Sequence, residues 1–343
     1  MDKGYGISEE TIGRWLQRSG RRDDIVLATK VYQPMGLGPN DRRLSAYHIR
    51  RACEASLRRL QTDHIDLYQM HHVDRATPWE EIWQAMEQLV REGKITYVGS
   101  SNFAGWDVAL AQSAASARHF MGLTSEQSLY HLAVRAVELE LIPALRSLGI
   151  GLIPYSPLHA GLLAGVLEAA TEGHISDDSM QQRIEAHRDQ LEAYEGLCRE
   201  LGAKPADVAL AWLLRNPVVS TAIVGATTSE ELRSNLGALS VQVDDEVVER
   251  LDGFGRGRGK PPRRTPGEAA TGPAPSSAVP LACHSEHDAT GPSGTAGATP
   301  GPHPGHERPD RSGQQRSLAV RFLPAHRPHS ARQRRSPQAP GGP

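Results

Sequence analysis

The stretch SLRRLQTDHIDLYQMHHVD, residues 56–74, decides the fold, because it holds the end of one helix and a complete strand. The helical apolar stripe ends at Leu60. The compact apolar run that follows, 65–71, is typical of a buried parallel strand, and its last residue is His71. The same order of strand, polar strand end and helix recurs six times along residues 24–240. Strands that alternate with helices predict a parallel sheet.

Polar residues stand where several of the predicted strands end, and this placement indicates a site. The strand ends read Ala-Thr-Lys at Lys30, Tyr-Gln-Met-His at His71, Gly-Ser-Ser-Asn at Asn102, Ser-Glu-Gln at Gln127, Tyr-Ser-Pro-Leu at Leu158 and Gly-Ala-Thr-Thr at Thr228. An eight-stranded β/α barrel builds its active site at the C-terminal ends of its strands. We therefore predict an α/β fold, a (β/α)8 TIM-type barrel that is incomplete here, with about six β/α units.

The hydrophobic periodicity gives the bounds of the predicted elements. Strands are predicted at 24–30, 65–71, 96–100, 123–129, 151–155 and 221–225. Helices are predicted at 8–17, 45–60, 79–91, 104–117, 134–148, near 178–202, at 205–215, 229–239 and 244–251. An open doubly wound sheet is the competing architecture, but it usually carries a Gly-rich fingerprint after its first strand, and none is present.

The charge of the chain is unevenly divided. From Phe254 onward, 13 Lys and Arg stand against 5 Asp and Glu, so this part carries +8 while the whole chain carries −2. Residues 1–253 therefore carry −10, which argues against a nucleic-acid surface. We predict a barrel body over 1–253 and a disordered Pro-, Gly- and Arg-rich tail over 254–343. Contact of the basic tail with an anionic partner remains an alternative.

Cysteine usage and hydropathy indicate the compartment. The three cysteines, Cys53, Cys198 and Cys283, are too few and too scattered for a disulfide framework or a zinc site, which fits a reducing cytosol. No run approaches the roughly 18 apolar residues of a membrane-spanning helix. The N-terminus has no apolar signal-peptide core. We therefore expect a cytoplasmic protein with no metal site and no membrane partner.

Seven stretches resemble one family in order and spacing. They are SEETIG at 8–13, VLATK at 26–30, SLRRLQTDHIDLYQMHHVD at 56–74, GKITYVGSSNF at 93–103, SEQSLY at 125–130, IPYSPL at 153–158 and AIVGATTSEELRSNL at 222–236. On these residues the chain resembles the aldo-keto reductases, in the branch with the potassium-channel β subunits and their bacterial relatives. The resemblance covers about 8–252 and does not extend to the tail. It implies a barrel enzyme that reduces a small carbonyl substrate, an aldehyde or ketone, to an alcohol with NADPH.

The resemblance also implies the catalytic groups. His71 would point into the oxygen site and hydrogen-bond the substrate carbonyl as a neutral imidazole. Lys30 would stand behind the proton donor and lower its pKa through nearby positive charge. His72 would line the substrate pocket, and Asp74 is interpreted as structural.

The cofactor residues are implied in the same way. Ser101, Asn102 and Gln127 resemble the trio that hydrogen-bonds the nicotinamide carboxamide, for which amide side chains supply both donors and acceptors. Tyr155 would stack on the nicotinamide ring, although a core aromatic residue is the alternative. Ser156 and Leu158 resemble the loop beside the pyrophosphate, and such late loops often bind phosphate in barrels.

The last predicted strand leads into a possible phosphate site. From Gly225, the sequence reaches Thr228 and Glu231, a capping-box pattern that opens a helix able to receive phosphate, and Asn235 keeps the adenine-side position. Thr227 replaces the arginine that the family uses to clamp the 2′-phosphate. This departure puts NADPH preference in doubt and keeps NADH as a candidate.

One family motif has no full counterpart. Asp-Thr-Ala-x-x-Tyr-Gly usually precedes the helix that begins here at Ser8, but only the Tyr5-Gly6 pair is similar, at a shorter spacing from Ser8. We expect a truncated N-terminus that lacks the first two barrel strands, and impaired activity, since loss of a general acid costs on the order of 100- to 10,000-fold in rate. Two other functions stay open: a nucleotide-binding regulatory module like the channel β subunits, and a non-functional fragment.

Overall fold

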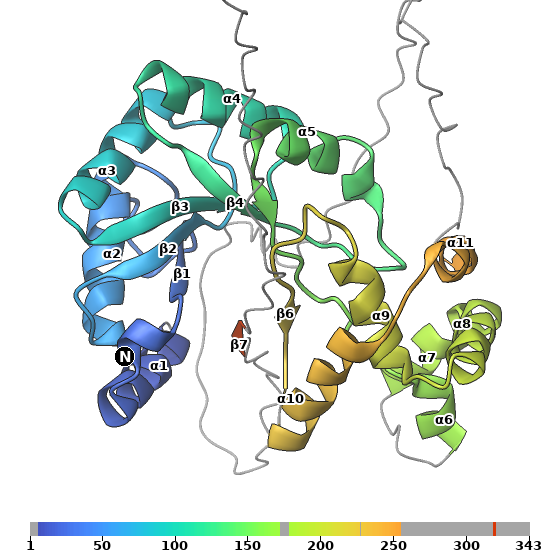
Figure 1. Cartoon of the computed structure of the whole chain (residues 1–343). Coiled ribbons are helices and arrows are strands. Elements are labelled where there is room, and N and C mark those ends of the chain that lie inside the picture. Colours follow the sequence, from blue (N-terminus) through green and yellow to red (C-terminus); the bar gives the residue numbers. More distant parts are fainter. Residues whose placement is uncertain (1–5, 172–177, 227, 255–317, 320–343) are drawn as a thin grey trace, which may run out of the picture. The chain divides into compact units, whose positions relative to one another are not determined.

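A five-stranded parallel sheet forms the centre of the fold, in the order β1-β2-β3-β4-β5 (Figure 1). The computed structural model describes residues 6–171, 178–226, 228–254 and 318–319. The strands are β1 (Ala28–Val31), β2 (Ile65–Met70), β3 (Ile95–Ser101), β4 (Leu123–Gln127), β5 (Gly151–Leu152), β6 (Ile223–Val224) and β7 (Leu318–Ala319). Beside β5, Val219 forms a parallel bridge to Leu152 and leads toward β6. The predicted parallel α/β fold is confirmed.

Helices follow the strands as predicted. They are α1 (Ile7–Ser19), α2 (Ala46–Leu60), α3 (Trp79–Arg91), α4 (Gly105–Ala117), α5 (Leu141–Leu148), α6 (Val166–Thr171), α7 (Asp178–Ala186), α8 (Arg188–Glu200), α9 (Pro205–Leu214), α10 (Ser229–Leu236) and α11 (Asp245–Phe254). Short 3-10 turns are η1 (Arg22–Asp24), η2 (Ala136–Glu138) and η3 (Gly237–Ser240). No helix among the described residues is long and apolar enough to cross a membrane.

The predicted helix over 134–148 is wrong in its first half. His131 and Val134 exchange backbone hydrogen bonds of 3.2 and 3.0 Å, a 3-10 turn follows, and α5 begins only at Leu141. Pro143 explains this start, because proline has no N–H and fits a helix only within its first turn. Helix α6 was not predicted.

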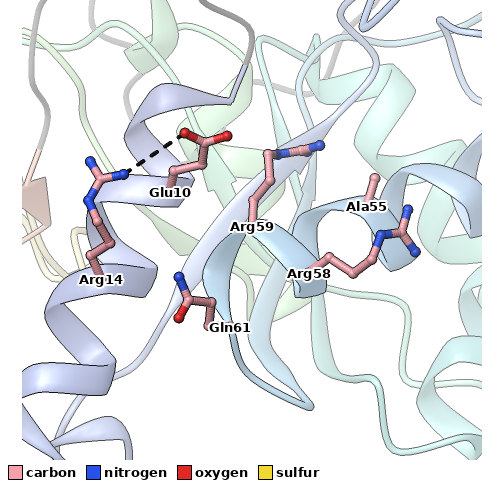
Figure 2. A pocket seen from close by; sticks show the side chains of 6 residues that line it. All are labelled: Glu10, Arg14, Ala55, Arg58, Arg59 and Gln61. Atoms are coloured by element: carbon pink, nitrogen blue, oxygen red, sulfur yellow. Dashed lines mark ion pairs between the residues drawn. The ribbon is translucent and has the colours of Figure 1, made fainter.

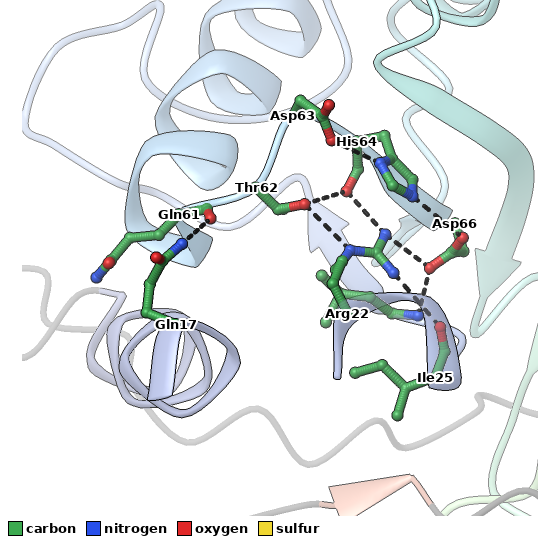
Figure 3. A network of polar contacts seen from close by, with 9 residues as sticks. Gln17, Arg22, Ile25, Gln61, Thr62, Asp63, His64 and Asp66 are labelled. Carbon is green, nitrogen blue, oxygen red and sulfur yellow. Dashed lines mark hydrogen bonds and ion pairs between the residues drawn. The ribbon is translucent and has the colours of Figure 1, made fainter. Parts of the chain in front are cut away.

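The first predicted strand is shorter than expected. Its predicted beginning, near Asp24, belongs to a 3-10 turn, and the Leu27 N–H donates to the Asp66 carboxylate at 2.7 Å. That carboxylate also pairs with Arg22 at 2.8 Å, and Arg22 donates further to the Thr62 hydroxyl at 3.0 Å and to the His64 carbonyl (Figure 3). This network joins the segment just before β1 to the beginning of β2.

Two faces of the sheet carry different residues. On one face, a Cβ added at Gly99 would lie 2.7 Å from the Ser125 hydroxyl oxygen and 3.1 Å from Gln69 Cγ, so only glycine leaves room there. The other face packs on the helices through fully buried residues, among them Tyr68 and Met70. This alternation is the one expected of a sheet with helices on its outside.

Helices α1 and α2 pack closely at Gly13, where a Cβ would lie 2.3 Å from the Arg59 carbonyl oxygen. Arg59 also pairs with Glu9 at 2.6 Å. Beside this contact lies an open pocket of about 430 Å³ (Figure 2). It is lined by Glu10, Arg14, Ala55, Arg58, Arg59 and Gln61, so it contains none of the residues predicted for the active site.

The predicted tail lies outside the described residues, apart from Phe254 and the two residues of β7. Strand β7 pairs antiparallel with β6, with Ala319 opposite Ile223 and Leu318 opposite Val224.

The Arg22–Asp66 network gives a stability test. We expect Asp66→Ala to lower the free energy of unfolding by about 2 kcal/mol, because the partly buried guanidinium and the Leu27 N–H both lose their acceptor. Urea unfolding followed by circular dichroism measures this. Asp23→Ala is the matched control, since that residue is exposed and its carboxylate is not part of the network. Equal losses in the two variants would contradict the role of the network.

Candidate active site

Lys30 and His71 lie at the C-terminal ends of two neighbouring parallel strands, β1 and β2. The His71 N–H donates to the Val31 carbonyl at 2.9 Å, which brings the end of β2 beside the end of β1. Burial, the Lys30 ammonium and His72 together lower the pKa of His71 to about 4, so its imidazole is uncharged at neutral pH. Burial also lowers the pKa of Lys30. In the part of the chain that the structure describes, Lys30 forms no ion pair.

Aromatic rings continue from His71. The His71 and His72 rings stack with centroids 5.0 Å apart, and Tyr32 meets His72 edge-on at 5.3 Å. Asp74 is buried and accepts hydrogen bonds from the Leu44 N–H at 3.2 Å and from the Thr77 hydroxyl at 2.9 Å. Asp74 therefore has the structural role that the sequence predicted.

Asn102 connects four strand ends. Directly after β3, its backbone N–H donates to the Gln127 carbonyl at 3.0 Å, and its side-chain NH₂ donates to the His71 carbonyl at 3.4 Å. Its side-chain oxygen accepts from the Tyr155 hydroxyl at 3.0 Å. The residue has φ of 57°, in the left-handed region that asparagine tolerates better than most residues. Three of the predicted site residues are thereby held around Asn102.

Ser101 and Gln127 stand opposite each other in the register of β3 and β4. Ser101 is 1% exposed and its hydroxyl oxygen accepts from the Asn102 side chain at 3.1 Å; Gln127 is 7% exposed. The Gln127 side-chain amide makes no hydrogen bond to another residue of the described ranges. A nearly buried amide without a protein partner suits a ligand that offers both a donor and an acceptor, such as a carboxamide.

Glu126 is a residue whose role the sequence analysis missed. It is fully buried beneath the Asn102 turn and accepts from the Phe103 N–H at 3.1 Å, the Ser128 hydroxyl at 2.7 Å and the Ser100 hydroxyl. Burial raises its pKa to about 7. A glutamate inside a strand that is otherwise buried was the available signal, because such a position needs hydrogen-bond partners.

Tyr155 begins the loop after β5. Its N–H donates to the Ser128 carbonyl at 3.1 Å. Ser156 has φ of 52°, so the chain turns sharply there, and Leu158 packs against the buried cluster of Leu210, Val224 and Ala238, which includes a residue of β6. The loop predicted beside the pyrophosphate therefore adjoins the strand that leads to Gly225.

Helix α10 begins where the sequence predicted. Thr228 is its N-cap, and the Thr228 hydroxyl oxygen accepts from the Glu231 N–H at 3.1 Å. Asn235, in the same helix, is 8% exposed, and Gly225 is exposed. Thr227 and Tyr5 lie outside the described residues.

Comparison with known proteins identifies the chain. The model of the aldo/keto reductase family matches residues 3–256. The chain belongs to the aldo/keto reductase family. A TIM-type barrel is the architecture expected for an aldo/keto reductase, these proteins are oxidoreductases, and nicotinamide nucleotides are their typical cofactors.

Individual relatives agree with the family and the branch. The chain is 50% identical over 262 residues to the uncharacterized oxidoreductase YrpG of Bacillus subtilis (strain 168), which covers 75% of this chain and 80% of the relative. It is 36% identical over 249 residues to a probable voltage-gated potassium channel subunit beta of Arabidopsis thaliana, covering 69% and 75%. It is 34% identical over 255 residues to the aldo-keto reductase str7 of Strobilurus tenacellus, covering 71% and 72%. The predicted branch is confirmed.

The buried Glu126 carboxyl gives a pH test. Its folded pKa lies above the ordinary 4.5, so its contribution to stability is full below pH 4.5 and is lost as pH rises through about 7. Glu126→Gln removes this loss. From pH 5 to pH 8, we expect the free energy of unfolding of the variant to gain about 2 kcal/mol relative to the parent. Urea titrations at both pH values measure this.

The control for that test is Glu140→Gln, which replaces an exposed carboxylate that accepts from the Trp106 N–H at 2.9 Å. From pH 5 to pH 8, the free energy of unfolding of Glu140→Gln should not show the gain relative to the parent that is expected for Glu126→Gln. A constant difference between Glu126→Gln and the parent across the pH range would contradict the account of Glu126.

Proposed function

We propose that this aldo/keto reductase reduces aldehydes or ketones to alcohols with a reduced nicotinamide nucleotide. The observation that carries the proposal is that the Asn102 side chain donates to the His71 carbonyl and accepts from the Tyr155 hydroxyl, while the Lys30 ammonium acts on the His71 imidazole. An ammonium, an uncharged imidazole and amide groups at one edge of a parallel sheet form a set that can hold a carbonyl beside a nicotinamide.

His71 and Lys30 act on the substrate oxygen. The uncharged His71 imidazole donates a hydrogen bond to the carbonyl, which polarises the C=O bond. Lys30 supplies positive charge where negative charge develops on that oxygen, and its burial strengthens the interaction. The oxygen takes a proton from water, which completes the alcohol.

The neighbouring strand ends would hold the nucleotide. Asn102 and Gln127 would hydrogen-bond the carboxamide together with Ser101, while Tyr155, held by Asn102, would stack on the ring and select its face. When bound, the reduced nicotinamide supplies the hydride that adds to the carbonyl carbon. The Tyr155 hydroxyl bond to Asn102 fixes the tyrosine and the amide relative to each other.

The loop of Ser156 and Leu158 and the start of α10 would hold the phosphates. Backbone N–H groups at a helix N-terminus favour anions. Thr228 is the N-cap of α10, so the backbone N–H groups of the first turn of α10 form such an N-terminus. Leu158 packs against the cluster that contains Val224 of β6, the strand that leads to Gly225 and α10. Asn235 contacts the adenine side.

The cellular setting follows from the thiols. Cys53 and Cys198 are free and buried, and burial raises the pKa of each to about 12, so both stay protonated. Such thiols suit a reducing compartment, and we infer that the protein acts in the cytoplasm. We assign the reductase to the body over 1–253.

His71→Ala tests the carbonyl site. We expect the single-turnover rate of NADPH oxidation with an aldehyde to fall by roughly 100- to 10,000-fold, because the polarising donor is lost. Residues 1–343 contain no Asp-Thr-Ala-x-x-Tyr-Gly motif, so the parent itself should turn over slowly, and enzyme in excess over NADPH keeps the rate measurable.

The dissociation constant for NADPH, from fluorescence titration, should stay unchanged in His71→Ala. His187→Ala, at an exposed position, is the control for both measurements. Reduction that survives in His71→Ala would remove His71 from the mechanism.

Thr227→Arg tests nucleotide preference. Thr227 stands where the family carries an arginine, and a guanidinium there would form charge-assisted hydrogen bonds with a 2′-phosphate. We expect the variant to bind NADPH about tenfold more tightly than the parent does, a gain of about 1.4 kcal/mol, with NADH affinity unchanged. An equal gain for NADH and NADPH would contradict this reading of position 227.

A second function follows from the similarity to a relative named a probable potassium channel subunit beta. In this alternative, the chain is a regulatory module in which nucleotide occupancy matters more than turnover. An aldehyde and ketone panel assayed with NADPH separates the two. The regulatory module predicts tight nucleotide binding and no oxidation with any carbonyl.

A further inference from the structure

Two histidine rings meet outside the proposed carbonyl site. His131 follows β4, and His159 lies in the loop after β5, one residue beyond Leu158. Their ring centroids are 4.5 Å apart with an interplanar angle of 41°, and His131 is only 2% exposed. Nothing in the proposed reaction uses either ring.

The His131 ring is held in a fixed position by its own turn. Its backbone exchanges two hydrogen bonds with Val134, and its Nδ1 accepts from the Ala133 N–H at 3.3 Å. The acceptor role of Nδ1 leaves the ring proton of the neutral form on Nε2. His131 therefore presents a rigid, uncharged surface to His159.

The loop that His131 contacts has an unusual backbone. Ser156, His159 and Ala160 have φ of 52°, 51° and 50°, all left-handed and disfavoured for residues with a Cβ. Backbone hydrogen bonds join the loop to itself: the His159 N–H donates to the Ser156 carbonyl at 2.9 Å and the Gly161 N–H to the Leu158 carbonyl at 3.0 Å. Arg183 of α7 donates to the His159 carbonyl at 2.9 Å. His159 Nδ1 is buried without a hydrogen-bond partner among the described residues.

We propose that His131 and His159 are positioning residues that hold the 156–161 loop in the conformation that receives the nucleotide pyrophosphate, and that they do so only while both rings are uncharged. The inference rests on the proposed function, because the same loop carries Ser156 and Leu158. A loop with three strained residues needs a rigid contact to stay closed, and the ring pair supplies it.

Charge on either ring opposes this packing. Burial lowers the pKa of His131 to about 4, with His159 and Arg183 adding to the effect. Burial, then Arg183 and His187, lowers the pKa of His159. Arg183 and His187 are the charged or titratable groups of the described residues that act on the pair from α7 and the turn after it. In the open loop the rings regain a pKa of about 6.5.

The sign of the pH effect follows. A histidine whose pKa is lowered in the closed loop contributes fully to the stability of that closed loop above about pH 6.5. Its contribution falls as the pH drops toward 4. The loop should therefore open more often at low pH. Between pH 7.5 and pH 5.5, His131 alone changes the opening equilibrium by about tenfold.

Hydrogen exchange measured by mass spectrometry on the full chain tests the proposal. After correction for intrinsic exchange, protection of the peptide covering 156–161 should fall about tenfold from pH 7.5 to pH 5.5, whereas α3 serves as the internal reference. In the double variant His131→Gln and His159→Gln, the pH dependence should disappear. His119→Asn, at an exposed position that does not act on either ring, should behave as the parent does.

NADPH separates this inference from the proposed function. Added at pH 7.5, NADPH should raise protection of the 156–161 peptide, and the double variant should bind it about tenfold more weakly. Nucleotide binding without added protection would overturn the loop assignment. A parent loop with pH-independent protection would overturn the role of the histidines even if the double variant does not fold. No NADPH binding by the parent at any pH would instead overturn the proposed function.

Discussion

The hydrogen bonds of Asn102 are the constraint on which the site depends. One residue donates from its backbone to β4, donates from its side chain to the residue after β2, and accepts from Tyr155 after β5. Only a short amide in a left-handed conformation satisfies all three, and Glu126 supports the turn from below through the Phe103 N–H. The relative positions of the strand ends, and with them the proposed nicotinamide pocket, follow from this arrangement.

The electrostatics of the fold are dominated by burial. His71, His131 and Glu126 all lose the charge they would carry in water at acidic or neutral pH, in each case chiefly through desolvation. Lys30 places an ammonium group beside the uncharged His71 imidazole. In the proposed reaction this pair polarises the carbonyl without consuming a proton from His71. In the proposal above, the same desolvation of His131 and His159 makes the loop after Tyr155 depend on uncharged rings.

Much of the fold and of the candidate site could be predicted from the sequence, because buried strands and polar strand ends are local patterns. Lys30 and His71 could be picked by their place after apolar runs, whereas Gln127 was picked by the family resemblance. The turn around Asn102 and the burial of Glu126 could not, since they depend on hydrogen bonds between strands that are distant in sequence. The prediction of a helix over 134–148 was wrong in its first half. The apolar residues there have helical periodicity, but the proline at 143 fits only the first turn of a helix, so α5 begins at Leu141.

A crystal structure of the chain soaked with NADPH tests the central claim most directly. The account predicts the nicotinamide carboxamide within hydrogen-bonding distance of Asn102 and Gln127, its ring against Tyr155, and the transferable hydrogen facing His71. Nucleotide bound elsewhere, for example in the arginine-lined pocket between α1 and α2, would contradict it. So would a nicotinamide in the expected pocket with His71 turned away from it.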